Sequence, residues 1–214
     1  MKQIKDTEFL VIDFETITPK GRTPEPIEVG VLRIKQNQID KDASVEWLIN
    51  PPDGLHLTEF DINQTGIREE DLEGKPNALT VMKRIDKSCT KKDYVFIAQN
   101  AKYEANILSH YTDECKGIAR TPIIDTILLA KYILPNLPNY KLDTLANTLG
   151  IQIPENRHRA LADCFLTAQV FLKMLKLQKE KIKLIDLDDL LRIAEIRTKY
   201  NQPQQMELSD FFEL

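Results

Sequence analysis

The sequence has few cysteines, no excess of basic residues and no long uninterrupted hydrophobic run. Its three cysteines, Cys89, Cys115 and Cys164, are widely spaced and form neither a disulfide framework nor a paired zinc motif. The 29 lysines and arginines are outnumbered by 33 aspartates and glutamates, which gives a formal net charge of −4. A non-specific nucleic-acid binder would be strongly basic, so any nucleic-acid role must rest on a local site.

Signals for export or membrane insertion are also missing. No apolar segment follows Met1 as it would in a secretory signal. The apolar stretch 123–134 is interrupted by Asp125 and Lys131 and is too short to span a bilayer. We therefore expect a cytoplasmic protein that makes no membrane contact.

The 214 residues, 42% of them hydrophobic, are enough for one domain with a buried core. Strand signals come first in the chain, at 9–12, 27–34 and 43–49. The polar stretch 35–38 suits a turn, so an antiparallel meander is expected. Strand and helix signals alternate afterwards, with strands at 94–98 and 122–125 and helices after 76 and at 103–111, from 126, at 141–148 and at 159–177. This order predicts an α/β fold with a mixed sheet flanked by helices.

The composition changes after the last of these helices. Residues 178–214 hold a charged stretch, an amphipathic helix signal at 187–200 and a final segment, 201–214, without a basic residue. We therefore predict a division into a main domain, 1–177, and a C-terminal helix with an acidic tail, 178–214.

Two carboxylates stand where the first apolar strand ends, at Asp13 and Glu15. Side chains two apart in a strand point to the same face, so these two lie side by side. Adjacent like charges are unfavourable unless a cation or a proton compensates them. The alternative is a strand that runs out into solvent with two ordinary acidic residues.

Two later segments supply more candidate groups. Glu104 lies in the first turn of an expected helix, where an acidic residue also complements the helix dipole. Asp163 lies among apolar residues of the 159–177 helix, a setting that a carboxylate avoids unless a metal or a partner is present. His158 precedes that helix and could converge with Asp163, or it could be structural.

In their order along the chain these segments resemble the DEDDh family of 3′→5′ exonucleases, which includes the proofreading subunit of bacterial replicative polymerases. The matching segments are Val11-Ile12-Asp13-Phe14-Glu15-Thr16, Gln64-Thr65-Gly66-Ile67, Gln99-Asn100-Ala101-Lys102-Tyr103-Glu104, Ile124-Asp125-Thr126, the Y-x-L-x-x-L-A run from Tyr140 to Ala146, and His158-Arg159-Ala160-Leu161-Ala162-Asp163. The resemblance covers about residues 7–177 and implies an RNase H-like fold.

The resemblance also implies a two-metal hydrolysis of phosphodiester bonds that releases nucleoside 5′-monophosphates. Asp13 would bridge two Mg²⁺ or Mn²⁺ ions, Glu15 and Asp163 would hold one of them, and Glu104 would position the other. His158 would be the general base. The chain departs from the family pattern at Glu104, where an Asp is usual, and at Gln99, where a His is usual.

The same resemblance implies where a nucleic-acid 3′ end would bind. The expected contacts to the terminal nucleotide are Phe14, Thr16, Thr65, Ile67 and Asn100. Lys102, Arg157 and Arg159 flank the acidic motifs and could meet phosphates or be ordinary solvated charges. We expect single-stranded or frayed DNA ends as substrate; a ribonuclease of the same fold and a non-catalytic nucleic-acid-binding module are the alternatives.

The acidic tail carries a separate signal. Gln205, Leu208, Phe211 and Phe212 are spaced as in the Q-x-x-L-x-x-F-F peptide that binds sliding clamps. Such a peptide inserts its apolar side chains into a pocket of the partner while a linker gives reach. The tail is therefore predicted to bind a clamp or a polymerase; alternatively, its apolar side chains fold back onto the protein's own core.

Overall fold

The computed structural model describes residues 2–19, 23–154, 157–181 and 186–196. Its centre is a six-stranded sheet in the order β3-β2-β1-β4-β5-β6. The strands are β1 (Glu8–Ile17), β2 (Glu25–Lys35), β3 (Gln38–Leu48), β4 (Tyr94–Ala98), β5 (Ile123–Asp125) and β6 (Glu195–Ile196). Strands β1 to β3 are antiparallel, β4 and β5 run parallel to β1, and β6 is antiparallel to β5. The predicted mixed α/β sheet of RNase H-like type is confirmed.

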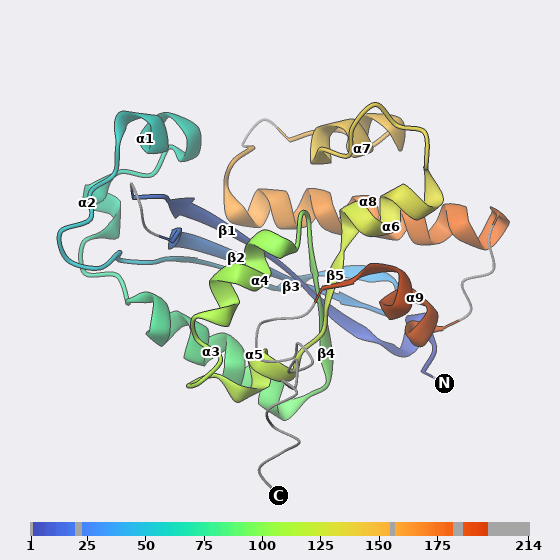
Figure 1. Cartoon of the computed structure of the whole chain (residues 1–214), viewed down its shortest axis with the longest axis horizontal. Coiled ribbons are helices and arrows are strands. Elements are labelled where there is room, and N and C mark those ends of the chain that lie inside the picture. The colour runs from blue at the N-terminus through green and yellow to red at the C-terminus, as the bar shows by residue number, and fades with distance from the viewer. Residues whose placement is uncertain (1, 20–22, 155–156, 182–185, 197–214) are drawn as a thin grey trace, which may run out of the picture.

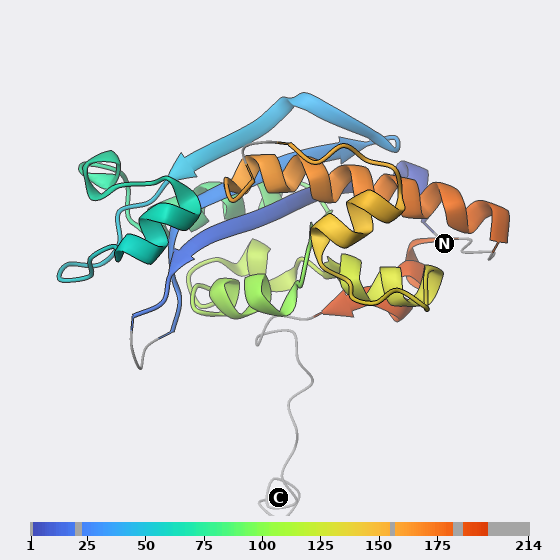
Figure 2. The same cartoon turned by 90° about the horizontal axis from the view of Figure 1, so that it is seen from above.

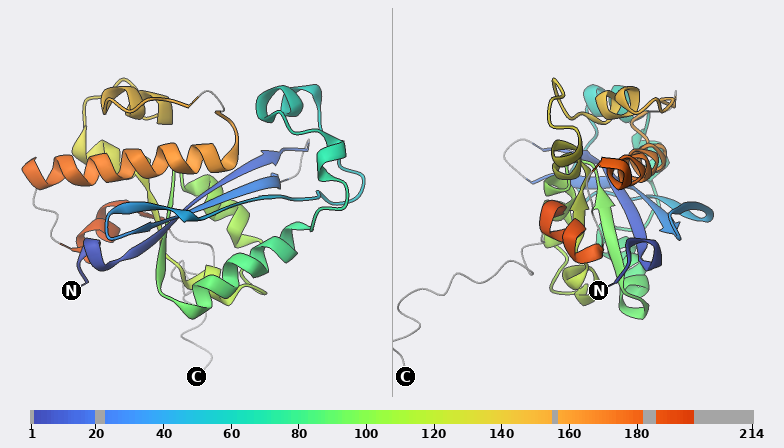
Figure 3. Two further views of the ribbon diagram at one scale, coloured as in Figure 1. Left: turned by 180° about the vertical axis from the view of Figure 1, so that it is seen from behind. Right: turned by 90° about the vertical axis from the view of Figure 1, so that its right-hand side faces the viewer.

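Helices cover both faces of this sheet. They are α1 (Glu59–Thr65), α2 (Glu69–Leu72), α3 (Ala78–Lys91), α4 (Lys102–Ser109), α5 (Lys116–Arg120), α6 (Thr126–Ile133), α7 (Leu142–Thr148), α8 (Ala160–Lys181) and α9 (Leu187–Ala194), after a 3₁₀ turn at Ile4–Asp6. The long helix α8 lies along one face with α6 and α7 beside it (Figures 1 and 2). Helices α3, α4 and α5 lie on the other face (Figures 1 and 3). No helix in the described ranges is long and apolar enough to cross a membrane.

The meander between β2 and β3 closes through a two-residue turn. Gln36 and Asn37 both have positive φ, 52° and 58°, in the left-handed region. Such a turn matches the right-handed twist of the two strands that it joins. The predicted turn at 35–38 is therefore found, and it fixes the register in which Lys35 faces Gln38.

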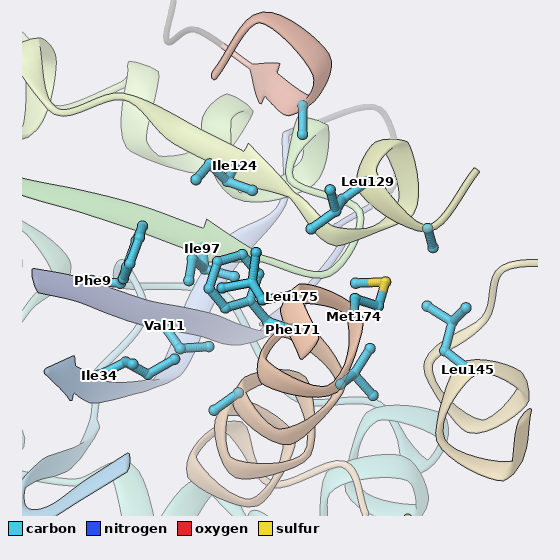
Figure 4. Packing of buried hydrophobic residues seen from close by; sticks show 14 of the residues in the cluster. Phe9, Val11, Ile34, Ile97, Ile124, Leu129, Leu145, Phe171, Met174 and Leu175 are labelled. Atoms are coloured by element: carbon cyan, nitrogen blue, oxygen red, sulfur yellow. The ribbon is translucent and has the colours of Figure 1, made fainter. Parts of the chain in front are cut away.

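Strand β1 divides the core into two clusters because its side chains alternate. Phe9 and Val11 point to the α8 face, where the ring of Phe9 meets the edge of Phe171 at 5.3 Å between centroids (Figure 4). Ile12 and Phe14 belong to the cluster under α3 and α4. Continuing this alternation, the positions of Asp13 and Glu15 fall on the face that α8 covers.

The first turn of α8 lies against β2 at Gly30. A Cβ added to this glycine would come within 2.5 Å of the Ala160 carbonyl carbon, so only glycine allows the helix so close. The Sγ of Cys164 donates a hydrogen bond to the Gly30 oxygen at 3.2 Å. Gly30 pairs with Asp13 across the two strands, so this contact brings the start of α8 next to the carboxyl end of β1.

The chain after α8 differs from the sequence prediction. The helix predicted over 187–200 ends at Ala194, and Glu195 and Ile196 form strand β6 on the edge of β5. The prediction was wrong there because an edge strand of two residues leaves too few positions for a period-2 pattern. Residues 201–214, with the predicted clamp-binding side chains, lie outside the described residues.

Candidate active site

Four carboxyl groups from three elements converge at the carboxyl end of β1. Asp13 and Glu15 come from β1, Glu104 from the first turn of α4 and Asp163 from the first turn of α8. Ligand atoms of Glu15, His158 and Asp163 lie within 4.8 Å of one another. Asp13 and Asp163 line the same pocket of about 640 Å³, and the charge of Glu104 acts on Asp13. The structure therefore brings the predicted catalytic residues together.

Three of these carboxyl groups are buried, and the pKa values of Asp13, Glu15 and Glu104 are raised. Only 7% of Glu15, 3% of Glu104 and 8% of Asp163 are exposed to solvent. Burial raises the pKa of Glu104 to about 8 and that of Glu15 to about 7, with the charge of Glu28 adding to the second shift. Burial and the charges of Glu104 and Glu15 hold the pKa of Asp13 well above its usual range. Without a compensating cation, the site therefore favours protons on its acids.

A positive charge also reaches into this cluster, from Arg157. Its guanidinium forms an ion pair with Asp163, and its Nε donates to Asp143 of α7 at 2.9 Å. The same charge opposes the rise in pKa of Asp13 and Glu15. His158, the next residue, is exposed and has a left-handed backbone with φ of 66°. Arg157 thus partly balances the acids in this structure.

The start of α8 is held by a residue that the sequence reasoning missed. Glu28 of β2 is fully buried, accepts a hydrogen bond from Ala160 N at 2.9 Å and pairs with Arg159 Nη2 at 2.6 Å. Arg159 also pairs with Glu46 of β3. Arg159 is thus tied to two carboxylates of the sheet, which favours the structural alternative over phosphate contact. The sequence feature that could have pointed to Glu28 is its position between two apolar strand residues, Ile27 and Val29.

The turn between β4 and α4 is built around Gln99 and Asn100. Gln99 Nε2 donates to the Tyr140 carbonyl at 2.8 Å, and its Oε1 accepts from Thr126 Oγ1 at 2.5 Å. Asn100 has φ of 63° and lines the carboxylate pocket. Gln99, where the family usually has a His, therefore joins the end of β4 to the loop before α7.

The other predicted nucleotide contacts do not line this pocket. Phe14 is buried in the cluster on the opposite face of the sheet. Thr65 and Ile67 are buried where α1 ends, with Ile67 N donating to Thr65 Oγ1 at 3.1 Å. The Thr16 hydroxyl shares a hydrogen bond with that of Tyr103. Their role in substrate binding stays a prediction.

Comparison with known proteins decides the family. The family model described as an exonuclease matches residues 10–171, a span that runs from β1 into α8 and includes all four carboxylates. The chain belongs to the exonuclease family. The prediction of a DEDDh-type 3′→5′ exonuclease, and with it of an enzyme, is confirmed.

Curated relatives of this exonuclease are polymerase chains. It is 30% identical over 194 residues to the PolC-type DNA polymerase III of Caldanaerobacter subterraneus and 32% identical over 191 residues to that of Thermotoga maritima. These alignments cover 90% and 89% of the chain. The chain spans only 13% of the length of either relative.

Solved structures show the same fold. The nuclease domain of 3′hExo, described as a DEDDh family member bound to rAMP, has a TM-score of 0.70 at 17% identity and covers 82% of this chain and 94% of that one. Escherichia coli exonuclease I in complex with a dT13 oligonucleotide has a TM-score of 0.68 at 18% identity and covers 81% of this chain and 42% of that one. At these identities the likeness is one of fold.

The carboxylates of this exonuclease fit the divalent metals on which the family depends. Glu104 Oε2 is buried and, within the described part of the chain, has no hydrogen-bond partner. Asp13, Glu15 and Asp163 add further oxygens, the ligand type that hard divalent cations prefer. A cation would satisfy the free oxygen and remove the repulsion that raises the pKa values. The residues present therefore fit a metal site.

Proposed function

We propose that this exonuclease removes nucleotides from the 3′ ends of single-stranded or frayed DNA, with Mg²⁺ or Mn²⁺ as two ions per site. The observation that carries the proposal is the cluster of Glu15, Asp163 and His158, whose ligand atoms lie within 4.8 Å of one another. Asp13 lines the pocket beside Asp163 and His158, and the charge of the buried Glu104 acts on Asp13. Two divalent cations held there would stabilise the charge that develops on the attacking and departing oxygens. DNA is favoured over RNA as substrate because the curated relatives are DNA polymerases.

The protein's own residues would then act in distinct ways. Asp13, Glu15 and Asp163 would hold the divalent cations and Glu104 would position the second one; bound there, the cations would supply charge stabilisation at the scissile phosphate. His158, exposed at the mouth of the site, accepts a proton from the attacking water. Water attacks phosphorus, the bond to the 3′ oxygen of the preceding nucleotide breaks, and a nucleoside 5′-monophosphate leaves. Glu104 is one methylene longer than the usual Asp and is buried.

The test is an assay with 5′-labelled single strands of DNA and RNA of one sequence, each with Mg²⁺ or Mn²⁺. The expected product is a ladder that shortens from the 3′ end, with DNA degraded faster. Asp13→Asn keeps the shape of the side chain but loses a ligand charge, and it should lower the rate by about 1,000-fold. Faster loss of RNA would identify an exoribonuclease, and no cleavage of either polymer would leave a nucleic-acid-binding module.

We further propose that the tail binds a sliding clamp through Gln205, Leu208, Phe211 and Phe212. The support is the spacing of these residues and the polar, proline-containing stretch 201–205 before them. Deleting 201–214 should abolish clamp binding, measured by surface plasmon resonance, while the hydrolysis of short oligonucleotides is unchanged. Clamp affinity that survives the deletion would contradict this proposal.

A further inference from the structure

The pocket that contains the carboxylates extends beyond them to helices α6 and α7. Its lining from β1 and α8 includes Asp13 and Asp163, which belong to the proposed metal site. Its lining from the opposite helices consists of Ile127 and Lys131 of α6 and the residues Tyr140, Lys141 and Leu142 around the start of α7. One continuous pocket of about 640 Å³ thus joins an acidic region to a basic one.

The two lysines in this basic region are not neutralised. Both are exposed, and among the described residues neither lies within ion-pair distance of a carboxylate. Lys131 Nζ lies 5.7 Å from the centre of the Tyr140 ring, a cation–π contact that attracts the ammonium group without neutralising its charge. Arg157, the third cation of the pocket, is already paired with Asp143 and Asp163. Lys131 and Lys141 are therefore the cations of this pocket that can receive an anion.

Hydrogen bonds fix the wall that carries these lysines. Gln99 Nε2 donates to the Tyr140 carbonyl at 2.8 Å, which attaches the loop before α7 to the end of β4. The Tyr140 hydroxyl donates to the Leu134 carbonyl at 2.9 Å, just after α6. Asn139 Oδ1 accepts from Lys141 N at 3.1 Å and from Thr144 Oγ1 at 2.6 Å. The backbones of both lysines consequently keep a set position relative to the carboxylates.

A strand whose 3′ end is being hydrolysed offers this wall a specific ligand. The terminal nucleotide carries a single phosphate, and this is the scissile phosphate at the carboxylates. The lysines must therefore bind other phosphates of the strand. The rest of the strand has one phosphate per nucleotide, and the strand extends away from the site on one side or the other. We propose that Lys131 and Lys141 bind the phosphates of the strand that precedes the scissile bond, with Ile127 and Leu142 as apolar support for its sugars. This inference rests on the proposed function.

The lysines should therefore matter for a polynucleotide and not for a single nucleotide ester. The double variant Lys131→Gln/Lys141→Gln is compared with wild type on single-stranded oligothymidylate and on thymidine 5′-(4-nitrophenyl phosphate), which has a scissile phosphate but no preceding strand. KM for the oligonucleotide should rise about 10- to 30-fold at 0.1 M salt, with kcat unchanged. The slope of log(kcat/KM) against log salt should become shallower by about 1.4, the value for two phosphate contacts on a single strand. Hydrolysis of the ester should stay within twofold.

The matched control is Lys83→Gln/Lys87→Gln, which removes the same charge from exposed positions on α3, on the other face of the sheet. This control should leave KM for the oligonucleotide within twofold of wild type. An equal rise in both double variants, an equal loss on both substrates, or an unchanged KM would each overturn the inference. A wild-type protein that cleaves neither substrate would instead contradict the proposed function.

Discussion

Glu104 and Glu15 show how buried carboxyl groups can make the stability of this exonuclease depend on pH and on a bound cation. Each pKa is raised from an ordinary value of 4.5, to about 8 for Glu104 and about 7 for Glu15, mainly by burial. The folded chain therefore binds protons in a pH range where the unfolded chain has released them. The free energy of unfolding falls as pH rises through that range. A cation favours the charged carboxylates and opposes this loss.

We expect the metal-free protein to melt at a lower temperature at pH 8.5 than at pH 5.5. The stabilising contribution of the protonated carboxyls is complete below about pH 4.5 and is lost as pH rises through 7 to 8. A fall of about 5–10 °C is predicted in EDTA, measured by differential scanning calorimetry. Mn²⁺ should raise the melting temperature more at pH 8.5 than at pH 5.5. Glu104→Gln, which cannot ionise, should show a smaller fall; a melting temperature that rises with pH in EDTA would contradict the argument.

The residues that the sequence singled out by type and spacing come together in the structure. Asp13 and Glu15 were candidates because two like charges lie side by side at a strand end, and Asp163 because it lies among apolar residues; the ordered resemblance to the exonuclease family then joined them into one site. The position of Arg157 was left open, since only the fold decides whether its side chain turns toward Asp163 or toward solvent. Glu28 was missed because its partner, Arg159, is far away in the chain and the register that brings them together is a tertiary property.

At the scale of elements, the contact between β2 and α8 sets the geometry of the site. Gly30 pairs with Asp13 in the sheet and touches the backbone of Ala160, while Glu28, two residue pairs further along the same strands, accepts a hydrogen bond from Ala160 N. Asp163 lies one turn into the same helix. Any shift of α8 away from β2 therefore moves Asp163 away from Asp13.

Gly30→Ala should separate α8 from the sheet. The added methyl group would lie 2.5 Å from backbone atoms of Ala160 and Leu161, and overpacking of this kind costs about 1–3 kcal/mol. Because Asp163 moves with the helix, we expect at least a tenfold loss of Mn²⁺ affinity by calorimetry and a similar loss of hydrolysis. The control is Gly54→Ala, which strains a positive φ of 78° but meets no atom within 4 Å. Unchanged metal affinity in Gly30→Ala would show that the close contact does not set the site.

The elements themselves were predictable to different degrees. Helix α8 was predicted close to its observed bounds, whereas the strand predicted over 9–12 continues to Ile17 as β1. Helices α1 and α2, of seven and four residues, were missed because they are too short for a clear apolar face. Their ends depend instead on local contacts, such as the Thr58 and Asp61 capping box of α1. Strand β6 was missed because its two residues form a strand only by pairing with β5. The local sequence has no preference that would indicate it.

At the scale of the whole molecule, the chain after α8 returns to the sheet. Leu187, Leu190 and Ala194 of α9 are buried in the same cluster as Val11 and Phe171. Leu187 N donates to the Lys2 carbonyl at 3.0 Å, which connects α9 to the beginning of the chain. The predicted boundary at residue 177 therefore calls for a test by truncation.

A chain that ends at Lys181 should be less stable than one that ends at Ile196. The shorter chain uncovers the sites of Leu187 and Leu190, and each buried leucine contributes about 1.5–3 kcal/mol. We expect a loss of roughly 3–6 kcal/mol in the free energy of unfolding by urea titration. Equal stability of both truncated chains would support a domain that ends at 177.

The buried thiol of Cys164 offers a chemical probe of how often helix α8 separates from the sheet. The side chain is fully covered and lies between the Gly30 and Val11 carbonyls, one residue from Asp163. A maleimide or another alkylating reagent can reach it only while α8 is detached from the sheet. The rate of its modification therefore measures how often α8 detaches from the sheet at this position. Cys89, which is partly exposed, supplies a faster reaction on the same chain for comparison.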